Sequence, residues 1–268
     1  MAFDTILLVG CGNMAGAMLQ GWLAGGLAPG QFTVADPASR ELPAGVRKLD
    51  TIPSEGAFDA ILLGVKPQLL GEVATQVEAL AGPGTVLVSI LAGVELAVLE
   101  QHFPRAKGLV RVMPNLAAAL GKSPLAVAER GLDEQGRQAA FALLAPLGSP
   151  EWIGEDEFDL VTALAGSGPA FVYRFIDALA AASADLGLPA EKAQRLAVAM
   201  VEGAAALAAA SPHDPAELAR RVASPGGVTQ AGLDAIDEGD SLRRLVERTL
   251  RAARDRSAEM AAEARRDG

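Results

Sequence analysis

The chain has 268 residues, of which 50% are hydrophobic, 4% aromatic and 21% charged. This length is enough for one large core or two modest ones, and two domains are the natural expectation. The formal net charge of −10 argues against a nucleic-acid partner, because phosphate binding requires a basic face. The single cysteine, Cys11, excludes an intrachain disulfide framework and is consistent with a reducing, cytoplasmic location.

Membrane and metal functions are not expected either. The first apolar run begins at Thr5 without the charged and then apolar leader of a secretory signal, and the alanine-rich stretch 203–210 is too short to span a bilayer. His102 and His213 lie far apart in sequence with no neighbouring cysteine. The sequence therefore predicts no metal site.

The N-terminal segment combines a strand, a glycine-rich turn and a helix. Residues 5–9 form an apolar run typical of a buried strand, and Gly10-Cys11-Gly12-Asn13-Met14-Ala15 follows directly. Apolar residues at helical spacing continue from Met18 to Leu23. In this context the glycines make a tight turn and admit the pyrophosphate of a dinucleotide. The segment predicts binding of a nicotinamide or flavin dinucleotide.

The first half of the chain continues as alternating strands and helices, and the second half is helical. Short buried runs separated by helices are typical of a parallel sheet. After Trp152 and Ile153 the strand signals stop, and a polar break follows. We expect one domain over residues 1–156 and a second over 157–268. The further strands of the first domain are predicted at residues 32–35, 60–65, 85–90 and 109–112.

The helical half is rich in alanine and poor in aromatic residues. Helices are predicted after Pro169, from about Pro189 to Ala210, from Pro215 and from about Asp240. Asp214 is expected to cap the third of these, with Glu217 placed for a capping box. Such a helical domain has few large apolar side chains with which to build a core of its own. We therefore expect its helices to be buried against a second copy of the chain.

Residues 224–229 read Ser-Pro-Gly-Gly-Val-Thr and open a predicted helix. Free N–H groups and the positive dipole end of a helix favour an anion, and glycines allow a ligand to approach the backbone. Thr229 adds a hydroxyl that can donate and accept. The segment is either a pocket for a small carboxylate or an ordinary turn between helices.

Taken together, these motifs resemble those of the pyrroline-5-carboxylate reductase family. The resemblance covers nearly the whole chain and rests on six short matches in the same order. They are Gly10-Cys11-Gly12-Asn13-Met14, Val65-Lys66-Pro67, Ser89-Ile90-Leu91-Ala92-Gly93, Arg111-Val112-Met113-Pro114-Asn115, Gly166-Ser167-Gly168-Pro169-Ala170-Phe171 and the turn at 224–229.

The resemblance implies an α/β Rossmann-type dinucleotide-binding domain followed by an all-α helical dimerisation domain. It implies an oxidoreductase acting on a CH–NH bond, which reduces the cyclic imine of 1-pyrroline-5-carboxylate to L-proline in the last step of proline biosynthesis. The implied assembly is a homo-oligomer, a dimer often assembled into a decamer.

The resemblance also implies roles for individual residues. The N–H groups of Gly226, Gly227 and Val228 would bind the substrate carboxylate, with Ser224 and Pro225 in the same turn, and Thr229 would hydrogen-bond the ring nitrogen as the catalytic residue. The cofactor-binding residues would be Gly10, Gly12, Asn13 and Met14 at the pyrophosphate, Val65, Lys66 and Pro67 beside a ribose, and Ala92, Met113, Pro114 and Asn115 at the nicotinamide end.

The choice between NADH and NADPH is left open by the sequence. Asp36 ends the second strand, where an acid binds ribose hydroxyls and repels a 2′-phosphate, which favours NADH. The family commonly prefers NADPH, and Arg40 with Ser39 lies close enough in sequence to hold a phosphate if Asp36 turns away.

The sequence leaves two alternatives, a second kind of enzyme and a protein without catalysis. A hydroxyacid dehydrogenase would also join a Rossmann domain to a helical one, but it needs an acid or base, usually a lysine, in the helical half. Lys192 is the only lysine after position 122, and it lies on what reads as a solvated helix face. A dinucleotide sensor without catalysis is the second alternative, and the substrate-like turn at 224–229 argues against it.

Overall fold

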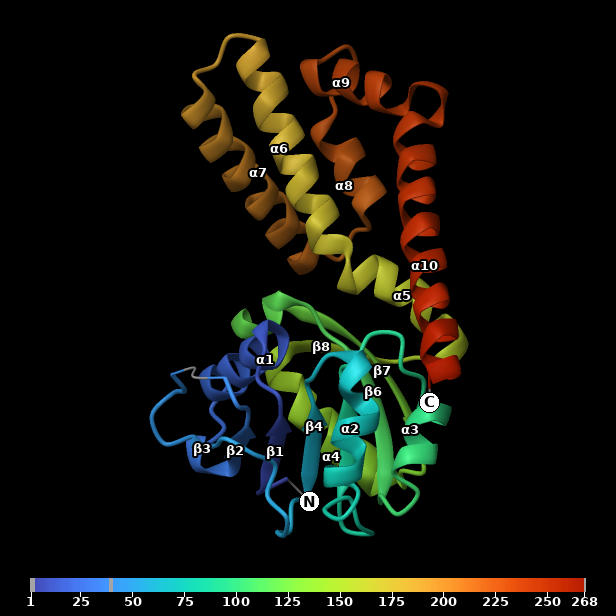
Figure 1. Cartoon of the computed structure of the whole chain (residues 1–268). Helices are drawn as coiled ribbons and strands as arrows, with labels where there is room; N and C mark the ends of the chain where they lie inside the picture. The colour runs from blue at the N-terminus through green and yellow to red at the C-terminus, as the bar shows by residue number, and fades with distance from the viewer. Residues whose placement is uncertain (1–2, 39–40, 268) are drawn as a thin grey trace. The chain divides into compact units, whose positions relative to one another are not determined.

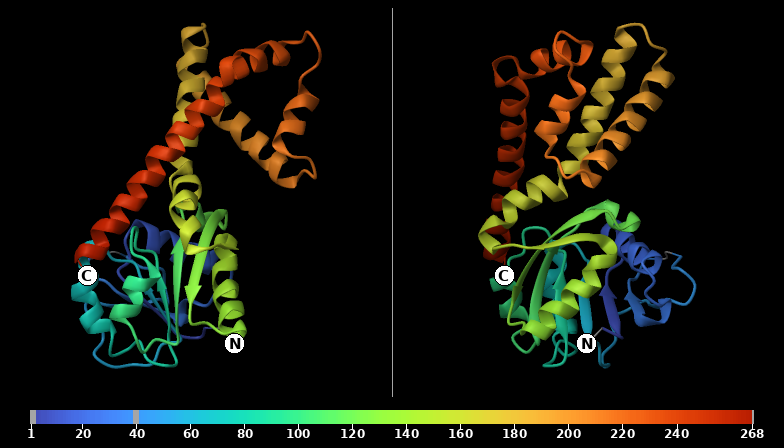
Figure 2. Two further views of the ribbon diagram at one scale, coloured as in Figure 1. Left: turned by 90° about the vertical axis from the view of Figure 1, so that its right-hand side faces the viewer. Right: turned by 180° about the vertical axis from the view of Figure 1, so that it is seen from behind.

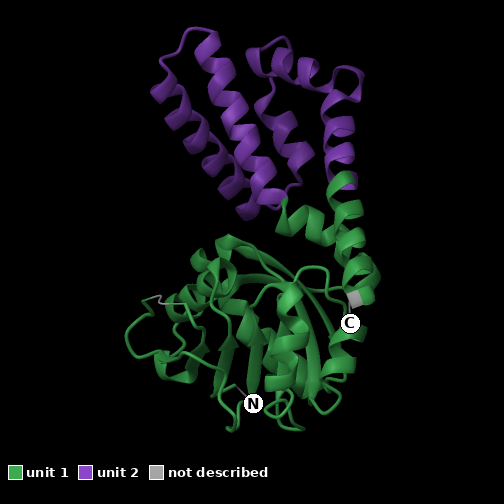
Figure 3. Cartoon of the chain, in the orientation of Figure 1, with its two compact units in different colours: residues 1–167, 252–268 green, residues 168–251 purple. Residues whose placement is uncertain are grey.

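The computed structural model describes residues 3–38 and 41–267, the last of these by its backbone alone. By their internal contacts they form two compact units, drawn in two colours in Figure 3. Unit 1 comprises residues 1–167 and 252–268, and unit 2 comprises residues 168–251. The chain therefore passes between the units twice, after Ser167 and within the last helix after Arg251. The sequence instead places one boundary after residue 156 and assigns no later segment to the first domain.

The described part of unit 1 is built on an eight-stranded sheet with the order β3-β2-β1-β4-β5-β6-β7-β8 (Figure 1). Neighbouring strands pair in parallel, except for the antiparallel pair β6 and β7. The predicted α/β class is confirmed. The strands are β1 (Ile6–Val9), β2 (Phe32–Ala35), β3 (Arg47–Leu49), β4 (Ala60–Leu63), β5 (Val86–Ser89), β6 (Gly108–Met113), β7 (Ser123–Arg130) and β8 (Gly148–Trp152).

Both faces of the sheet carry apolar side chains. Helices cover both faces (Figure 2). In β1, Ile6 and Leu8 belong to one core, whereas Leu7 and Val9 belong to the other. This alternation follows from the two-residue period of a strand. The first core is covered by α1 (Asn13–Ala24) and α4 (Glu134–Leu144), and the second by α2 (Leu70–Val77) and α3 (Leu96–His102).

Three of the strands are not predicted by the sequence. β3 is short and mostly exposed, β7 contains Pro124, and β8 contains Gly148 and Pro150. Glycine and proline are poor strand formers, so these segments lack the apolar pattern of the others. The expected parallel sheet is therefore mixed at this edge, because β7 runs antiparallel to β6.

Unit 2 is helical, as predicted. Pro169 lies in the first turn of its first helix, and Asp214 caps α8 by accepting the N–H of Glu217 at 2.8 Å. The predicted capping box is wrong, because the Glu217 carboxylate accepts from Arg220 and Arg221 instead. The helices are α6 (Gly168–Asp185), α7 (Ala190–Ala210), α8 (Pro215–Val222), α9 (Val228–Asp237) and α10 (Ser241–Asp267), of which α10 continues into unit 1.

Unit 2 has almost no core of its own. Within residues 168–251, all of which the structure describes, only Ala193 and Ala197 are buried. Among the described residues, α7 is the one helix long and apolar enough to cross a membrane, although the core helix of a soluble protein passes the same test. Large apolar side chains stay exposed on α6 and α7, among them Val172, Tyr173, Phe175, Leu196, Val198, Met200 and Leu207.

Candidate functional site

The predicted glycine-rich turn lies between the carboxyl end of β1 and the first turn of α1. Gly10 has a φ of +84°, and a Cβ on it would lie 2.8 Å from Cγ1 of Val65, so a larger residue does not fit. Gly12 is the N-cap of α1 and makes no side-chain cap. No described atom lies within 4 Å of a Cβ built on Gly12. The turn, with Asn13 and Met14 behind it, therefore has the N–H groups, dipole and open approach that an anion requires.

The end of β4 lies against this turn. A Cβ on Gly64 would lie 2.8 Å from the carbonyl oxygen of Gly10. The strand order reverses between β1 and β4, which is where open α/β sheets bind ligands. Val65 is half-buried, and the exposed Lys66 is the N-cap of the short 3-10 helix η2 (Pro67–Leu69). The structure therefore brings Val65, the first of the predicted cofactor residues 65–67, beside the glycine turn.

Asp36 follows β2, and its carboxylate is bound to the glycine turn. Oδ2 accepts the N–H of Cys11 at 2.6 Å, and Oδ1 accepts the N–H of Ala38 at 2.7 Å. The side chain therefore ties the end of β2 to the turn, a role that the sequence does not predict. Each carboxylate oxygen can accept a second hydrogen bond, so acceptor capacity remains for ribose hydroxyls. Arg40, the alternative determinant, lies outside the described residues, as does Ser39.

Two neighbouring strand ends carry the residues predicted for the nicotinamide end. Ala92 is half-buried in the segment between β5 and α3, and Met113 ends β6 with Pro114 buried behind it. Because β5 and β6 are parallel, their carboxyl ends meet at one edge of the sheet. A Cβ on Gly166 would lie 3.3 Å from Sδ of Met113. Gly166 ends a π-helical turn, η6 (Thr162–Gly166), a rare conformation that is frequent at functional sites.

Asn115 is buried, and both polar atoms of its side chain form hydrogen bonds with the backbone. Nδ2 donates to the carbonyl oxygen of Ala165 at 2.9 Å, and Oδ1 accepts the N–H of Ala117 at 2.9 Å. The side chain therefore caps the 3-10 helix η3 (Leu116–Leu120) and holds the chain that precedes α6. Through these contacts Asn115 supports the backbone of residues 115–117 and 165.

A buried charge precedes these residues and is not predicted as part of the site. Arg111 of β6 is 2% exposed, and its Nη1 donates to Oε1 of Glu155 at 3.3 Å. Its guanidinium carbon lies 3.8 Å from the centroid of the Phe158 ring, and its Nε has no hydrogen-bond partner among the described residues. Burial lowers the pKa of Arg111, while Glu155 acts in the opposite direction. The sequence does contain one sign of this buried charge, which is an arginine within the apolar run at 109–112.

The predicted carboxylate-binding turn lies in unit 2. Gly226 has a φ of +71°, and the N–H of Gly227 donates to the carbonyl oxygen of Ser224 at 2.9 Å, which closes the turn. Gly227 is the N-cap of α9 and makes no side-chain cap. Thr229 lies in the first turn of α9, as predicted. Ser224, Pro225, Gly226, Val228 and Thr229 are all exposed.

The arrangement has binding groups for a dinucleotide in unit 1 and for a small anion in unit 2. Lys192, the candidate acid or base of a hydroxyacid dehydrogenase, is exposed in the first turn of α7. Over residues 3–38 and 41–267, no cluster of three or more His, Cys, Asp or Glu side chains could hold a metal ion. The described turns therefore suit a phosphate group in unit 1 and a small anion in unit 2.

Comparison with protein families, like the internal contacts of the structure, divides the chain into a mainly N-terminal and a mainly C-terminal part. Residues 155–260 match the model of the pyrroline-5-carboxylate reductase dimerisation family. Residues 5–93 match a family described as NADP oxidoreductase, coenzyme F420-dependent. The presence of a dimerisation domain supports homo-oligomerisation, and the second match supports an NADP-type dinucleotide as the cofactor.

Individual relatives and solved structures agree over the whole length. A pyrroline-5-carboxylate reductase of Pseudomonas aeruginosa is 36% identical, over 97% of this chain and 98% of its own. Pyrroline-5-carboxylate reductase 3 of Danio rerio is 32% identical, over 94% and 90%. The structure of a pyrroline-5-carboxylate reductase from Coxiella burnetii superimposes with a TM-score of 0.87 at 26% identity, over 96% and 98%.

A second solved structure gives a likeness of fold alone. A pyrroline carboxylate reductase of Plasmodium falciparum with NADP bound superimposes with a TM-score of 0.83 at 23% identity, over 96% of this chain and 98% of that one. The full-length identity to the two relatives, rather than this likeness, shows the family. The chain therefore belongs to the pyrroline-5-carboxylate reductase family.

Proposed function

We infer that this chain catalyses the NAD(P)H-dependent reduction of 1-pyrroline-5-carboxylate to L-proline, the last step of proline biosynthesis. The observation that carries the inference is the full-length match to the Pseudomonas aeruginosa relative of that name. The glycine turn of unit 1 and the anion-binding turn of unit 2 supply the two kinds of binding that this reaction needs. Neither alternative function has a comparable observation in its favour.

The residues of unit 1 hold the dinucleotide, which when bound supplies the hydride. The N–H groups of the glycine turn and the positive end of α1 bind the pyrophosphate. Asp36 would bind the adenosine ribose while it holds the turn, and residues 65–67 would hold the cofactor's sugars. Ala92, Met113 and Pro114 line the nicotinamide end, and Asn115 fixes that segment from behind.

The residues of unit 2 hold the substrate. Its carboxylate accepts from the N–H groups of Gly226, Gly227 and Val228, and the Thr229 hydroxyl binds the ring nitrogen. A hydride adds to the carbon of the C=N bond, and the nitrogen carries or takes up one proton. Because an imine is far more basic than a carbonyl and can bind already protonated, a hydroxyl that orients the ring suffices. Orientation of the ring then provides most of the rate gain.

We propose a dimer formed through the exposed apolar faces of α6 and α7 and assembled further into a decamer. The support is the dimerisation family match together with a helical unit that buries only two alanines within 168–251. A second copy would also cover α7, whose composition would otherwise suit a membrane. The family's biosynthetic role and the single cysteine support a cytoplasmic location.

A steady-state assay with both cofactors tests the function. Consumption of NADH or NADPH absorbance is expected on addition of 1-pyrroline-5-carboxylate and not with a 2-keto acid. Turnover of the keto acid alone would favour a hydroxyacid dehydrogenase. Tight binding of the dinucleotide without turnover of either compound, in folded protein, would indicate a sensor. The ratio of kcat/KM for the two cofactors decides the preference that the sequence leaves open.

A further inference from the structure

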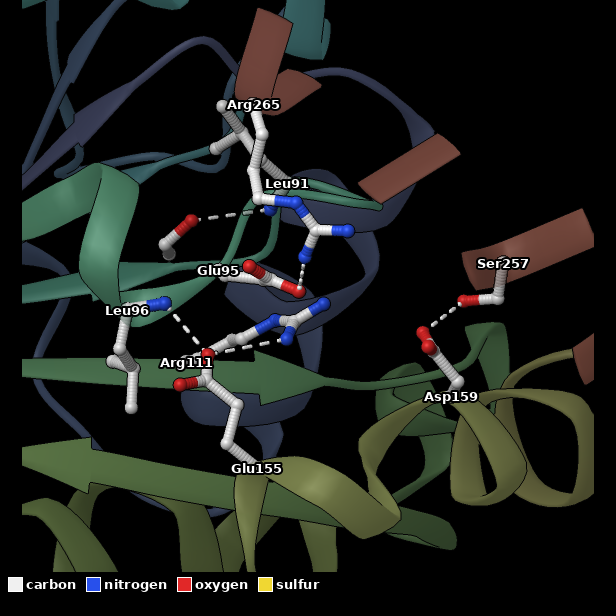
Figure 4. Close-up of polar contacts among 9 residues, drawn as sticks. Leu91, Glu95, Leu96, Arg111, Glu155, Asp159, Ser257 and Arg265 are labelled. Carbon is white, nitrogen blue, oxygen red and sulfur yellow. Dashed lines mark hydrogen bonds and ion pairs between the residues drawn. The ribbon is translucent and has the colours of Figure 1, made fainter. Parts of the chain in front are cut away.

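The segment between β5 and α3, residues 90–95, is held by side chains from distant parts of unit 1 (Figure 4). We call it the β5–α3 loop. At its start, the N–H of Leu91 donates to Oγ of Ser89 at 3.3 Å. At its end, Glu95 accepts from Arg265 of α10 at 2.5 Å. The loop that contains Ala92 is therefore anchored on both sides of that residue.

Gly93 brings the backbone of α10 directly against the loop. Its φ is +76°, a conformation that favours glycine. A Cβ on Gly93 would lie 3.1 Å from both the carbonyl carbon and Cβ of Met260. Because the nearest atoms include backbone, a side chain at this position would displace either the loop or the helix. The close approach therefore requires glycine next to Ala92.

The part of α10 that makes these contacts belongs to unit 1 and turns one face to the rest of that unit. Ser257, Ala261 and Arg265 recur every four residues and so share a helix face, with Met260 beside them. Ser257 donates to Oδ1 of Asp159 at 2.7 Å and is 9% exposed, and Ala261 is 2% exposed. These four residues of α10 form what we call the docking face.

Glu155 completes the support beneath the loop. Its Oε1 accepts the N–H of Leu96, the first residue of α3, at 2.6 Å and also accepts from Arg111 at 3.3 Å. Since Arg111 lies in β6, the carboxylate joins β6 to the beginning of α3. A buried arginine is costly unless it is paired, so the pair resists displacement.

We propose that the docking face of α10 and Glu155 position the β5–α3 loop, and through it Ala92, at the nicotinamide end of the dinucleotide. This proposal rests on the proposed function, which places Ala92 there. Hydride transfer depends steeply on alignment, and a misplacement of about 1 Å costs up to roughly a hundredfold in rate. The glycine turn follows β1 instead, so grip on the pyrophosphate does not depend on the docking face.

The test compares two alanine-to-glutamate substitutions in α10. Ala261→Glu introduces a carboxylate at the buried centre of the docking face, where Ala261 is 2% exposed, and should lift this face from the loop. Ala258→Glu places the same side chain three residues earlier, where Ala258 is exposed. We expect Ala261→Glu to lower kcat about 10- to 100-fold while the Kd for ADP-ribose, which lacks nicotinamide, changes less than about twofold. Ala258→Glu should leave both quantities near the wild-type values.

Two results with folded Ala261→Glu protein would overturn the proposal. One is a wild-type kcat, and the other is an equal loss of ADP-ribose affinity, which would indicate general distortion of unit 1. If Ala261→Glu fails to fold, Arg265→Glu tests the same contact, because it opposes two carboxylates at Glu95. The charge swap Glu95→Arg with Arg265→Glu should restore kcat, and a swap as impaired as the single variant would contradict the proposal.

Fluorescence of bound NADH or NADPH separates this proposal from the proposed function. The nicotinamide ring reports its own surroundings whether or not 1-pyrroline-5-carboxylate is reduced. A changed spectrum in Ala261→Glu but not in Ala258→Glu supports the positioning role, even if the wild-type protein turns over no substrate. An identical spectrum in both variants overturns it, even if the wild-type protein is an active reductase.

Discussion

Units 1 and 2 both contain many apolar residues, but only unit 1 buries them within a single chain. Leu7, Leu63 and Val110 of the sheet are completely buried between helical layers. Within the described residues 168–251, only Ala193 and Ala197 are buried. The same kind of composition thus produces a complete core in one region and an unfinished surface in the other. Apolar content alone does not show whether a region folds on its own.

The largest expected effect comes from charging the unfinished surface. Met200 of α7 is 51% exposed, and Met200→Asp should place a carboxylate in the interface between copies. We expect the dissociation constant of the assembly to rise at least about a hundredfold, which corresponds to about 2.7 kcal/mol. Light scattering at several concentrations measures the change.

The matched control lies in unit 1. Phe141 of α4 is 41% exposed and belongs to a region with its own complete core. Phe141→Asp should therefore leave the assembly unchanged. If Phe141→Asp separates the copies and Met200→Asp does not, the roles assigned to the two regions are reversed.

Thr229 should affect catalysis without affecting stability, because it is exposed on unit 2. Thr229→Val keeps the shape but removes the partner of the ring nitrogen. A hydrogen bond to a charged group is worth roughly 1.5 to 3 kcal/mol, so kcat should fall about 10- to 100-fold. Thr229→Ser should recover much of the rate, and binding of proline should change little.

Thr249→Val is the control for that substitution. Thr249 is also in unit 2, where its hydroxyl donates to the carbonyl oxygen of Leu245 at 2.9 Å. The variant Thr249→Val should therefore keep the wild-type kcat. A wild-type rate in Thr229→Val would mean that Thr229 is only a residue of the helix start and that the proton is handled by water or by protonated substrate.

Asp36 should affect both cofactor choice and the glycine turn. Removing its charge relieves repulsion of a 2′-phosphate, so Asp36→Ser should raise the ratio of kcat/KM for NADPH over NADH. For ~1.4 kcal/mol of relieved repulsion the change is about tenfold. Asp36→Ser also loses the acceptor for the N–H of Cys11, so KM for both cofactors should rise.

Asp36→Asn separates the two roles of this residue. It removes the charge but keeps one oxygen as an acceptor, so it should raise the ratio with a smaller increase in both KM values. Steady-state kinetics with both cofactors measures the difference. A ratio that stays constant in both variants would show that the charge of Asp36 does not select the cofactor.

The smallest expected effect is local and confined to unit 1. Oδ2 of Asp59 accepts the N–H groups of Asp4 and Thr5 and the Thr5 hydroxyl, each at 2.9 Å. Burial acts to raise the pKa of Asp59, but the hydrogen bonds outweigh it and hold the pKa below the ordinary value of 3.8. The ionised form is therefore the stabilising one in the folded protein.

Asp59→Asn should lower the free energy of unfolding by about 1 kcal/mol at neutral pH. Because the folded pKa is depressed, this contribution is present above the unfolded pKa and is lost as pH falls through the folded value. The difference between the variant and the wild type should thus close in acid. Both tryptophans, Trp22 and Trp152, belong to unit 1, so their fluorescence during urea unfolding reports this region. A constant difference down to acid pH would contradict the assignment.

The sequence predicts the elements whose local patterns are strong. The buried strand, glycine turn and helix at the N-terminus require particular residues at particular spacings, and the helices of unit 2 follow from their periodicity and from the cap at Asp214. β7 and β8 escape prediction because Pro124, Gly148 and Pro150 obscure the strand pattern. Their place at the edge of the sheet is determined by pairing with residues that are distant in sequence.

The sequence predicts which segments form the candidate site but not the hydrogen bonds between their side chains and distant residues. The glycine turn and the turn at 224–229 adopt the expected backbone forms, while the roles of individual residues stay predictions. No local pattern shows that the Asp36 carboxylate accepts the N–H of Cys11. None shows that the Asn115 side chain donates to the carbonyl oxygen of Ala165. Arg111 and Glu155 are likewise joined only by the fold, because side-chain direction across a sheet depends on tertiary packing.

The discontinuity of unit 1 along the chain affects the order in which its parts are made. At a ribosomal rate of about 5 to 20 residues per second, residues 257–265 are synthesised roughly 5 to 20 seconds after Ser167. During that interval the residues of all eight strands have been made, but Gly93 and Glu95 cannot yet contact α10. On the positioning role proposed above, a nascent chain acquires the means to grip a pyrophosphate before it acquires the means to align a hydride donor.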